Sequence, residues 1–403
     1  MSARRVHMRV APDPTLRVDA ARQVPHQALF TPMPIAIVGG AAEPGIVTSG
    51  VSPDRATCFG PRGAALLGPD GPLWVSDTGH HRLLGWRQIP TAEGTPADWV
   101  IGQPDFSHEG RNAKGPCGAT TLNVPTGVCR LGEHGMAVAD AWNHRVLLWH
   151  RAPTDSHVAP DVVLGQANFE EDLPNRGADS PGANTLYWPY GVGASHGKLF
   201  IADAENRRVL IWDSIPTASG QPADRVLGQR DFACRDENAG SAPSAMSMRW
   251  PHGVTLWKGH LCVSDAGNNR IMVWREAPQA HGQPCDVILG QASAAGVDHN
   301  QSLYWPRANT LNMPYDLTAV GDWLLTADTA SSRLLAWHLD DLVDNAPARA
   351  LAGQANFHEK GDNRWQMPTA DSLCWPYGIT SCGDTVVVAD SGNNRVSLWR
   401  TAL

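Results

Sequence analysis

Short apolar runs closed by an aspartate recur along this chain, each followed by a polar loop and a second apolar run. In one copy the run LFIAD (199–203) precedes a four-residue loop, and RVLIW (208–212) follows. Apolar side chains fall on both faces of the second run, which is typical of a strand covered on both sides. This copy shows no helical period, so we predict short strands separated by turns.

The pattern occurs six times at a fixed period. In every copy an Arg follows the Asp by five residues and a Trp follows the Arg by four, and the steps between successive Asp residues are 63, 63, 62, 63 and 62 residues. The triplets are Asp77/Arg82/Trp86, Asp140/Arg145/Trp149, Asp203/Arg208/Trp212, Asp265/Arg270/Trp274, Asp328/Arg333/Trp337 and Asp390/Arg395/Trp399. Such a period marks an array of one supersecondary unit, which buries its faces only against its neighbours.

Each unit contains four predicted strands. In the copy at 188–229 a strand after Pro189 leads to a hairpin turn at 196–198, the two apolar runs follow, and RVLGQ closes the unit. Four-stranded units of this length, arranged radially, are the blades of a β-propeller. The sequence therefore predicts an all-β fold, a single six-bladed propeller spanning residues 31–403.

The two ends of the array predict how the ring closes. Five copies end in a Gly-Gln strand, but the last stops near Trp399 before any such strand. The segment 35–40 (IAIVGG) resembles the missing piece, so we expect this N-terminal strand to complete the last blade and leave no long open edge. Residues 1–30 precede it and are expected to form an N-terminal arm of unassigned role.

Two repeats carry a family resemblance. The strings GVTLWKGHLCVSDAGNNRIMVW (253–274) and GITSCGDTVVVADSGNNRVSLW (378–399) resemble the NHL repeat, and the VLGQ-x-x-F strings are similar to those of a bacterial subset with long connecting loops. The resemblance implies a β-propeller. NHL propellers include RNA-binding modules, protein-interaction scaffolds and relatives with lyase or lactonase chemistry, so function has to be argued from the site.

Positions that are identical in all six copies are expected to be structural. The Asp residues can accept backbone N–H groups of the loops that they open. The planar Arg fork can bridge to the neighbouring blade, and the Trp residues can pack between blades. Because binding or catalysis needs asymmetry, the candidate site lies where the copies differ.

The middle residue of the Pro-x-Gly start varies among the blades. It is expected to open the innermost strand at the mouth of the central channel, and the row reads Arg62, Thr126, Tyr190, His252, Tyr315 and Tyr377. The fifth copy also replaces Gly with Asp316. We expect Arg62, Tyr190, His252, Tyr315, Asp316 and Tyr377 to converge there, either as a site for a small polar ligand or as a hydrogen-bonded plug of side chains.

The residue before Pro forms a second candidate row. Trp188, Trp250 and Trp375 occupy it in three copies. They either staple the long connecting loops to their blades or offer an aromatic rim to a partner, since Trp is a favoured interface anchor. An extra Tyr304-Trp305-Pro306 lies in a lengthened loop and breaks the repeat.

Histidine and acidic residues accumulate in loops of the same face. His80, His81 and His144 follow the Asp positions, and His108-Glu109, Asp298-His299 and His358-Glu359 lie in loops that feed the inner strands. These are ligand types for a first-row divalent metal, but their spacing supports no particular metal. They are otherwise solvated loops, and no cofactor is predicted.

Composition narrows the classes of partner. The net charge of −8 and only four lysines in 403 residues argue against a nucleic-acid partner. No apolar stretch approaches the 18 residues of a membrane span, and the N-terminus lacks the apolar region of a secretory signal. Eight cysteines without regular spacing fit a reducing, cytoplasmic setting.

The sequence favours a non-enzymatic scaffold that binds a protein partner or a small polar ligand on the long-loop face. The alternative is a metal-dependent lyase or hydrolase at the channel mouth. The related amidating lyases need several histidines on one zinc, and lactonase-like propellers need several carboxylates around an ion, whereas the inner strands here start with only His252 and Asp316. Enzyme activity is therefore left open, with no catalytic residue assigned.

Overall fold

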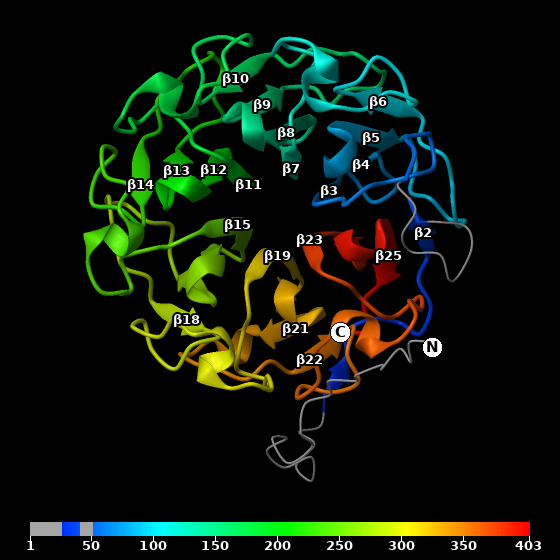
Figure 1. Cartoon of the computed structure of the whole chain (residues 1–403). Coiled ribbons are helices and arrows are strands. Elements are labelled where there is room, and N and C mark those ends of the chain that lie inside the picture. The colour runs from blue at the N-terminus through cyan, green and yellow to red at the C-terminus, as the bar shows by residue number, and fades with distance from the viewer. Residues whose placement is uncertain (1–25, 41–50) are drawn as a thin grey trace, which may run out of the picture.

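A computed structural model describes residues 26–40 and 51–403 of the chain. In this part of the chain six antiparallel sheets stand around a central axis like blades (Figure 1). Five sheets have four strands and one has five. The strands follow sequence order from the axis outward except for the N-terminal strands that join the last two blades, and no α-helix occurs among the described residues. The prediction of an all-β six-bladed propeller is confirmed.

The blades are numbered in chain order. Blade one contains β3 (Gly63–Leu66), β4 (Leu73–Asp77), β5 (Arg82–Trp86) and β6 (Trp99–Ile101). Blade two contains β7 (Pro125–Leu131), β8 (Gly135–Asp140), β9 (Arg145–Trp149) and β10 (Val162–Leu164). Blade three contains β11 (Pro189–Ser195), β12 (Lys198–Asp203), β13 (Arg208–Trp212) and β14 (Arg225–Leu227). Blade four contains β15 (Pro251–Trp257), β16 (His260–Asp265), β17 (Arg270–Trp274) and β18 (Val287–Leu289).

The last two blades include N-terminal strands. Blade five contains β19 (Pro314–Val320), β20 (Trp323–Asp328), β21 (Arg333–His338) and β22 (Ala350–Ala352), with β1 (Gln27–Ala28) added parallel to β22. Blade six contains β23 (Pro376–Cys382), β24 (Thr385–Asp390), β25 (Arg395–Arg400) and β2 (Ala36–Val38). The pairing of β2 with β25 is antiparallel, with Ile37 opposite Ser397. The ring therefore closes as the chain ends predict.

The segment before β2 crosses from blade five to blade six. His26 lies edge-on to Phe357 of the loop after blade five, and β1 pairs with β22. Leu29 is fully buried, and Phe30 stacks on Trp399 with ring centroids 5.1 Å apart. Residues 26–30 thus bind the outer edges of two blades, while residues 1–25 of the expected arm lie outside the described residues.

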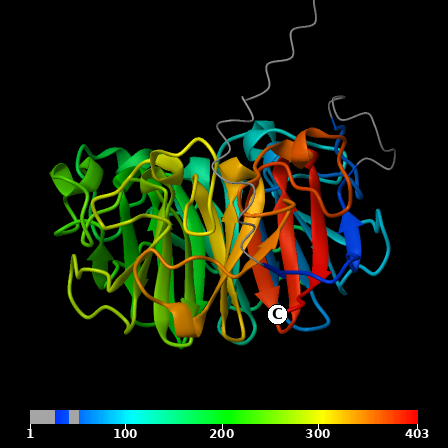
Figure 2. The same cartoon turned by 90° about the horizontal axis from the view of Figure 1, so that it is seen from below.

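The two faces of the disc differ in their short 3₁₀ turns. Six follow the repeat Asp residues: η2 (Thr78–His80), η4 (Ala141–Asn143), η6 (Ala204–Asn206), η8 (Ala266–Asn268), η10 (Thr329–Ser331) and η13 (Ser391–Asn393). Five lie in the long connections: η3 (Arg111–Lys114), η5 (Pro174–Gly177), η7 (Glu237–Gly240), η9 (His299–Ser302) and η12 (Asp362–Trp365). These turns gather on one face, called the loop face, whereas the hairpins, η11 (Leu339–Asp341) and the C-terminus lie on the other, the hairpin face (Figure 2).

Across the described ranges, no helix has the length and apolar character needed to cross a membrane.

A buried Asp–Arg pair organises the loop face of each blade. In blade three, Asp203 accepts the backbone N–H of Tyr187 at 2.7 Å and the Nε–H of Arg208 at 2.8 Å. The guanidinium of Arg208 also donates to the carbonyl of Phe232, in the connection that leaves the blade, and to that of Thr185, in the connection that enters it. Asp203 thus accepts a backbone N–H, but from the connection that enters the blade and not, as expected, from the loop that it opens. Arg does not reach the strands of the neighbouring blade, because its fork is occupied by the two long connections.

The hydrophobic core consists of layers between adjacent blades. One layer joins Trp257, Cys262 and Val273 of blade four to Leu324 and Trp337 of blade five. Each repeat Trp is buried in such a layer, which confirms its expected packing role. Since both faces of a blade are covered, the alternation of polar and apolar residues is lost in the third strands β5, β9, β13, β17, β21 and β25.

We predict that Arg208→Ala lowers the free energy of unfolding by about 3–5 kcal/mol, because the Asp203 carboxylate then stays buried without its partner. Thermal and denaturant melting would measure the loss. The matched control is Arg400→Ala, which breaks an exposed pair with Asp384 and should cost less than about 1 kcal/mol. Equal losses in the two variants would contradict the structural role of the buried pair.

Candidate functional site

The row of differing residues at the inner-strand starts meets at the propeller axis. The rings of Tyr190 and His252 lie 4.3 Å apart, those of His252 and Tyr315 also 4.3 Å, and those of Tyr315 and Tyr377 4.6 Å. The Arg62 guanidinium lies over the Tyr377 ring at 4.7 Å. The structure thus brings five predicted site residues together in one layer, called the aromatic layer.

The aromatic layer is tightly packed. Tyr190 is 3% exposed and His252 is 1% exposed. Electrostatic contact with Tyr190 raises the pKa of Arg62, and burial raises the pKa of Tyr190. The Thr126 hydroxyl donates to the carbonyl of Tyr190 and joins blades two and three. These side chains therefore fill the channel at its loop-face end, as the plug interpretation expects.

The closeness of the inner strands explains the glycine after each of these residues. A Cβ at Gly191 would lie 2.0 Å from the carbonyl oxygen of His252 in the next blade, so no larger residue fits there. Blade five departs from this rule. Asp316 takes the glycine position, and Gly253 leaves room for it, because a Cβ at residue 253 would lie 2.8 Å from Asp316 Oδ1.

Asp316 lies inside the channel and has no ion-pair partner among the residues that the structure describes. Its Oδ2 accepts the backbone N–H of Ile379 in blade six at 3.0 Å, and Oδ1 accepts that of Leu317 at 2.9 Å. Loss of solvent raises the pKa of this carboxyl to about 7, because the two N–H donors offset only part of the cost of burying the charge. Asp316 can therefore gain or lose a proton near neutral pH.

A cavity of about 290 Å³ lies along the axis below the aromatic layer. Its lining begins at Arg62, Tyr190 and His252 and continues to the hairpin ends of the inner strands, where Arg130 and Cys382 line it. The channel is therefore hollow on the hairpin side of the aromatic layer. Tyr315 and Tyr377 belong to the aromatic layer but do not line the cavity.

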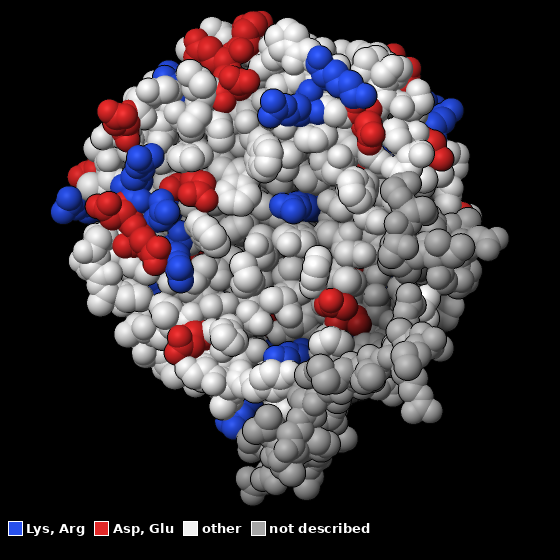
Figure 3. Space-filling model, in the orientation of Figure 1, with Lys and Arg blue, Asp and Glu red and all other residues white. Residues whose placement is uncertain are grey.

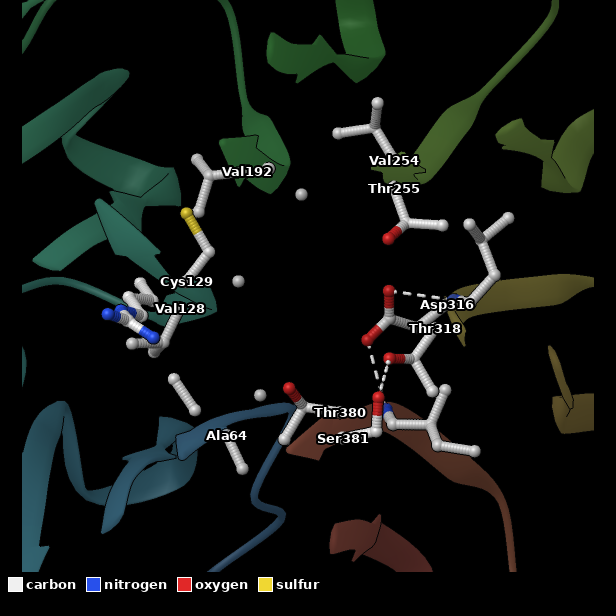
Figure 4. A pocket seen from close by; sticks show the side chains of 18 of the residues that line it. Ala64, Val128, Cys129, Val192, Val254, Thr255, Asp316, Thr318, Thr380 and Ser381 are labelled. Atoms are coloured by element: carbon white, nitrogen blue, oxygen red, sulfur yellow. Dashed lines mark hydrogen bonds between the residues drawn. The ribbon is translucent and has the colours of Figure 1, made fainter. Parts of the chain in front are cut away.

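The cavity has two chemically different walls (Figure 4). Blades four to six contribute Thr255, Asp316, Thr318, Thr380 and Ser381. The hydroxyls of Thr318 and Ser381 bond to each other at 2.9 Å, and Ser381 also donates to the carbonyl of Ala319. Blades one to three contribute the small or apolar side chains Ala64, Val128, Cys129 and Val192, with Arg62 at the loop-face end and Arg130 and Ser195 at the hairpin end.

His252 carries a buried acceptor that no other described residue satisfies. Its Nδ1 lies 2.9 Å from the carbonyl of Trp250, so Nδ1 holds the proton and Nε2 has a free lone pair. Burial lowers the pKa of His252 to about 4, so the ring is neutral at physiological pH. The His252 ring lines the loop-face end of the cavity, but Nε2 itself is enclosed by neighbouring atoms.

The three tryptophans before Pro have different surroundings. Trp188 lies edge-on to Tyr190 and His252, with ring centroids 6.2 Å away in both cases, and supports the aromatic layer. Trp375 is 49% exposed and Trp250 is half-buried on the same face. Trp188 therefore fits the interpretation as a packing residue. Trp375 is exposed and fits the interpretation as part of an aromatic rim.

A hydrogen bond between blades fixes the backbone of this row. In five of the six copies, the side chain of the residue before the repeat Arg accepts the backbone N–H of the residue before Pro in the next blade. His144 Nδ1 accepts from Trp188 at 3.1 Å, His81 Nδ1 from Val124, and Asn269 Oδ1 from Met313. The fourth blade differs because Arg207 at this position has no acceptor atom. Trp250 there bonds to Asp265 within its own blade.

The loop histidines are thus engaged in structural contacts. His80 bonds to Asp77 and to the carbonyl of Val51, and His108 bonds to Asp105. Within residues 26–40 and 51–403, no three His, Cys, Asp or Glu side chains are grouped as metal ligands. The residues present therefore do not fit the ligand set that a metal-dependent lyase or lactonase requires.

The extra Tyr304-Trp305-Pro306 packs against the following connection. The Lys360 ammonium lies 4.0 Å from the centre of the Tyr304 ring and 5.8 Å from that of Trp305. This cation–π contact joins the connections before and after blade five. The insertion is therefore part of the loop face rather than of the channel.

The sequence analysis did not identify the polar wall, although the sequence contains a row of residues that indicates it. Three residues beyond the Pro-x-Gly variable position, blades one to three have Ala65, Cys129 and Gly193, and blades four to six have Thr255, Thr318 and Thr380. The copies were compared only at the strand starts. Extending the comparison by three residues would have found the hydroxyl row.

Similarity to known proteins supports the fold. A model of the NHL repeat matches residues 248–274, which contain β15, β16 and β17, and this confirms the expected NHL resemblance. No curated protein matches the chain. A solved protein of unknown function from Bacteroides thetaiotaomicron has 12% identity, covers 92% of this chain and 75% of its own, and has a TM-score of 0.51.

Two further solved structures are more distant. Hydrazine synthase of Kuenenia stuttgartiensis has 12% identity, with 89% of this chain and 99% of that chain covered and a TM-score of 0.48. Virginiamycin B lyase of Staphylococcus aureus has 13% identity, with coverages of 85% and 95% and a TM-score of 0.41. Similarities this weak carry no argument about function.

We predict that His144→Asn removes part of the acid sensitivity of the fold. Burial lowers the pKa of His144 to about 4. Its stabilising contact is therefore fully present above the unfolded pKa near 6.5 and is lost as the pH falls toward 4, by on the order of 2 kcal/mol. Asn keeps an acceptor, as Asn269 does in blade four, but cannot be protonated.

Melting curves of the wild type and of His144→Asn between pH 8 and pH 4 would measure the effect. The stability difference should change in favour of Asn as the pH falls. Parallel curves over this range would contradict the proposed acceptor role of Nδ1.

Proposed function

We propose that this protein, a six-bladed propeller of the NHL-repeat type, is a non-enzymatic binding scaffold that holds a small polar ligand in its central channel. The main support is the cavity below the aromatic layer, which is lined by the Asp316 carboxyl, an acid without an ion-pair partner among the described residues. Buried charges are normally paired, and one that is not is a candidate for contact with a ligand.

The proposed site lies deeper than the mouth on the loop face. Side chains of the aromatic layer occupy that mouth, so a ligand would enter from the hairpin face, where the lining reaches Arg130, Ser195 and Cys382. The surrounding ring of six blades is closed, and buried ion pairs hold each blade. This favours a site that is already formed before the ligand binds.

The rival enzymatic function has weaker support. Acid–base chemistry would have to use Asp316 and His252, and the neutral Asp316 carboxyl could supply a proton near pH 7. The channel adds neither a nucleophile with an adjacent base nor a set of metal ligands among the described residues. We therefore propose binding rather than turnover.

A protein partner on the loop face is a second proposal with its own support. Large apolar side chains are exposed there, including Trp365 at 67%, Trp375 at 49% and Trp142 in the turn after β8. Exposed Trp residues on a rigid scaffold are suitable interface anchors. Acidic and basic side chains are interspersed over the outer part of this face (Figure 3), which does not favour a nucleic-acid partner.

The proposed setting is the cytoplasm. All eight cysteines fall in the described residues and are free, and burial raises the pKa of the Cys262 thiol well above its usual range. Reduced, buried thiols fit a reducing compartment.

We predict that Cys129→Phe abolishes small-molecule binding by filling the channel. Cys129 lies on the wall opposite Asp316, so a phenyl ring there would occupy the cavity without touching the acid. Mass spectrometry of small molecules that are released on unfolding of natively purified protein would measure binding. The wild type should release a bound molecule and the variant none.

The control is Cys234→Phe, the same exchange in a loop outside the channel lining. It should release the same molecule as the wild type. Identical release from all three proteins, or no release from the wild type together with no binding from a panel of small polar compounds, would overturn the channel-binding proposal.

We predict that Trp375→Ala weakens capture of a protein partner by at least about tenfold, the usual effect of losing an anchor residue. Affinity capture from the native cytoplasm with Trp250→Ala, Trp375→Ala and Cys129→Phe as baits would test this. Cys129→Phe should retain the partner. Retention by both Trp variants would remove the loop face as the docking surface.

A further inference from the structure

The channel contains a carboxyl whose negative charge nothing in the described chain balances. Asp316 forms no ion pair with a Lys or Arg of residues 26–40 and 51–403, although six buried Asp–Arg pairs surround it in the same fold. The guanidinium of Arg62 is engaged by the tyrosines of the aromatic layer instead. An unpaired charge in a poorly solvated site favours a cation from outside the chain.

The neighbouring side chains of this wall can accept hydrogen bonds. The hydroxyls of Thr255, Thr318 and Thr380 each offer lone pairs to a donor, besides their own O–H. A donor-rich group placed between blades four and six would therefore meet a carboxylate and several further acceptors. An ammonium group, with its positive charge and its N–H donors, has these properties.

The opposite wall has the complementary character. Ala64, Val128 and Val192 present only hydrocarbon to the cavity, and Figure 4 shows them across the axis from Asp316. A ligand that is polar at one end and apolar at the other would satisfy both walls at once. The volume of about 290 Å³ suits a small molecule of this kind.

We propose that the channel binds a small organic cation, with its ammonium group at Asp316 and its apolar arm against Ala64, Val128 and Val192. This inference rests on the proposed ligand-binding function and names its ligand class. The cation supplies the charge that the described chain lacks, and it donates to the acceptors of the polar wall.

Other ligand classes fit these walls less well. A carboxylate or phosphate would meet the Asp316 charge on this wall, and the guanidinium groups of Arg62 and Arg130 lie at the two ends of the cavity rather than beside it. A neutral alcohol could donate hydrogen bonds but would leave the buried charge uncompensated. A divalent metal would find a single carboxylate and one imidazole, fewer ligands than a closed metal site uses.

Binding of this kind is coupled to the protonation of Asp316. A proton competes with the cation for the carboxylate, and the pKa of about 7 places this competition in the neutral range. The ionised fraction rises about tenfold between pH 6 and pH 8, so the affinity for a permanently charged amine should rise by about the same factor.

The other groups that face Asp316 do not change charge in this range. The pKa of His252 is about 4, that of Tyr315 is raised to about 12, and that of Tyr190 lies higher still. Arg62 stays charged, and burial raises the pKa of Cys129 on the opposite wall to about 12. Tyr377 of the aromatic layer and Arg130 and Cys382 at the hairpin end complete the titratable and charged groups around the cavity.

Three probes of one shape test the ligand class: benzylammonium, benzyl alcohol and benzoate. Their dissociation constants for the wild-type protein can be measured by ligand-observed NMR at pH 6 and pH 8. Benzylammonium should bind at least about tenfold more tightly than the alcohol at pH 8 and lose about tenfold at pH 6. Benzoate should not bind in the channel.

Two variants locate the effect. Asp316→Asn should abolish the preference for the amine over the alcohol and its pH dependence. The matched control Asp384→Asn removes a carboxylate from the β23–β24 hairpin, on the same face but outside the channel, where it pairs with Arg400. It should bind benzylammonium as the wild type does.

A wild-type measurement keeps the test decisive if Asp316→Asn does not fold. The ¹³C shift of the Asp316 carboxyl reports its pKa directly, and saturating benzylammonium should lower that pKa by about one unit or more, since the bound cation favours the ionised form. An unchanged carboxyl pKa would overturn the proposal.

The outcomes separate the ligand class from the proposed function. If the alcohol or benzoate binds as tightly as the amine and Cys129→Phe abolishes that binding, the channel is a ligand site but not a cation site. If none of the probes binds while natively purified protein releases another small molecule, the cation proposal also fails alone. If neither probes nor native molecules bind, both proposals fail.

Discussion

The buried Asp–Arg pair, repeated once in each blade, is the interaction on which the rest of this structure depends. A propeller blade is a small sheet with two apolar faces, and its long connections would otherwise expose unpaired backbone groups. The Asp–Arg pair supplies hydrogen-bond partners for these backbone groups within each blade. In blade three, Asp203 holds the backbone just before the inner strand, while Arg208 holds carbonyls of both adjoining connections. Because the charges balance each other, the buried network costs less than either ion alone.

Because the six blades repeat the same residues at equivalent positions, a position that departs from the repeat is informative. Glycine is required where adjacent inner strands approach the axis, and the carbonyl of His252 would collide with any side chain at residue 191. Asp316 is the departure from this row, and it is also an acid in the channel that pairs with no cation of residues 26–40 and 51–403. Polar residues of blades four to six surround it, and apolar residues of blades one to three face it. The asymmetry of the six copies is therefore concentrated in the channel, where all blades meet.

The sequence predicted the site in part. Comparing the copies at one position identified the aromatic layer, because a row of equivalent residues in a closed ring must meet at the axis. It did not distinguish an open mouth from a packed layer, since that depends on how the rings of Tyr190, His252 and Tyr315 fit together. The acceptor role of His144 was hidden for a similar reason. Its partner, the backbone N–H of Trp188, belongs to the next blade and lies 44 residues away.

The sequence by itself determined the number of blades, their strand order and the closure of the ring. These follow from a fixed repeat and from a strand that is missing at one end and present at the other, both of which are local patterns. Only the tertiary structure decided that the channel is filled at the loop face and hollow beyond it, and that Asp316 pairs with no cation in the part of the chain that the structure describes. Those features depend on distances between side chains of different blades. Such distances exist only after all six blades have closed around the axis.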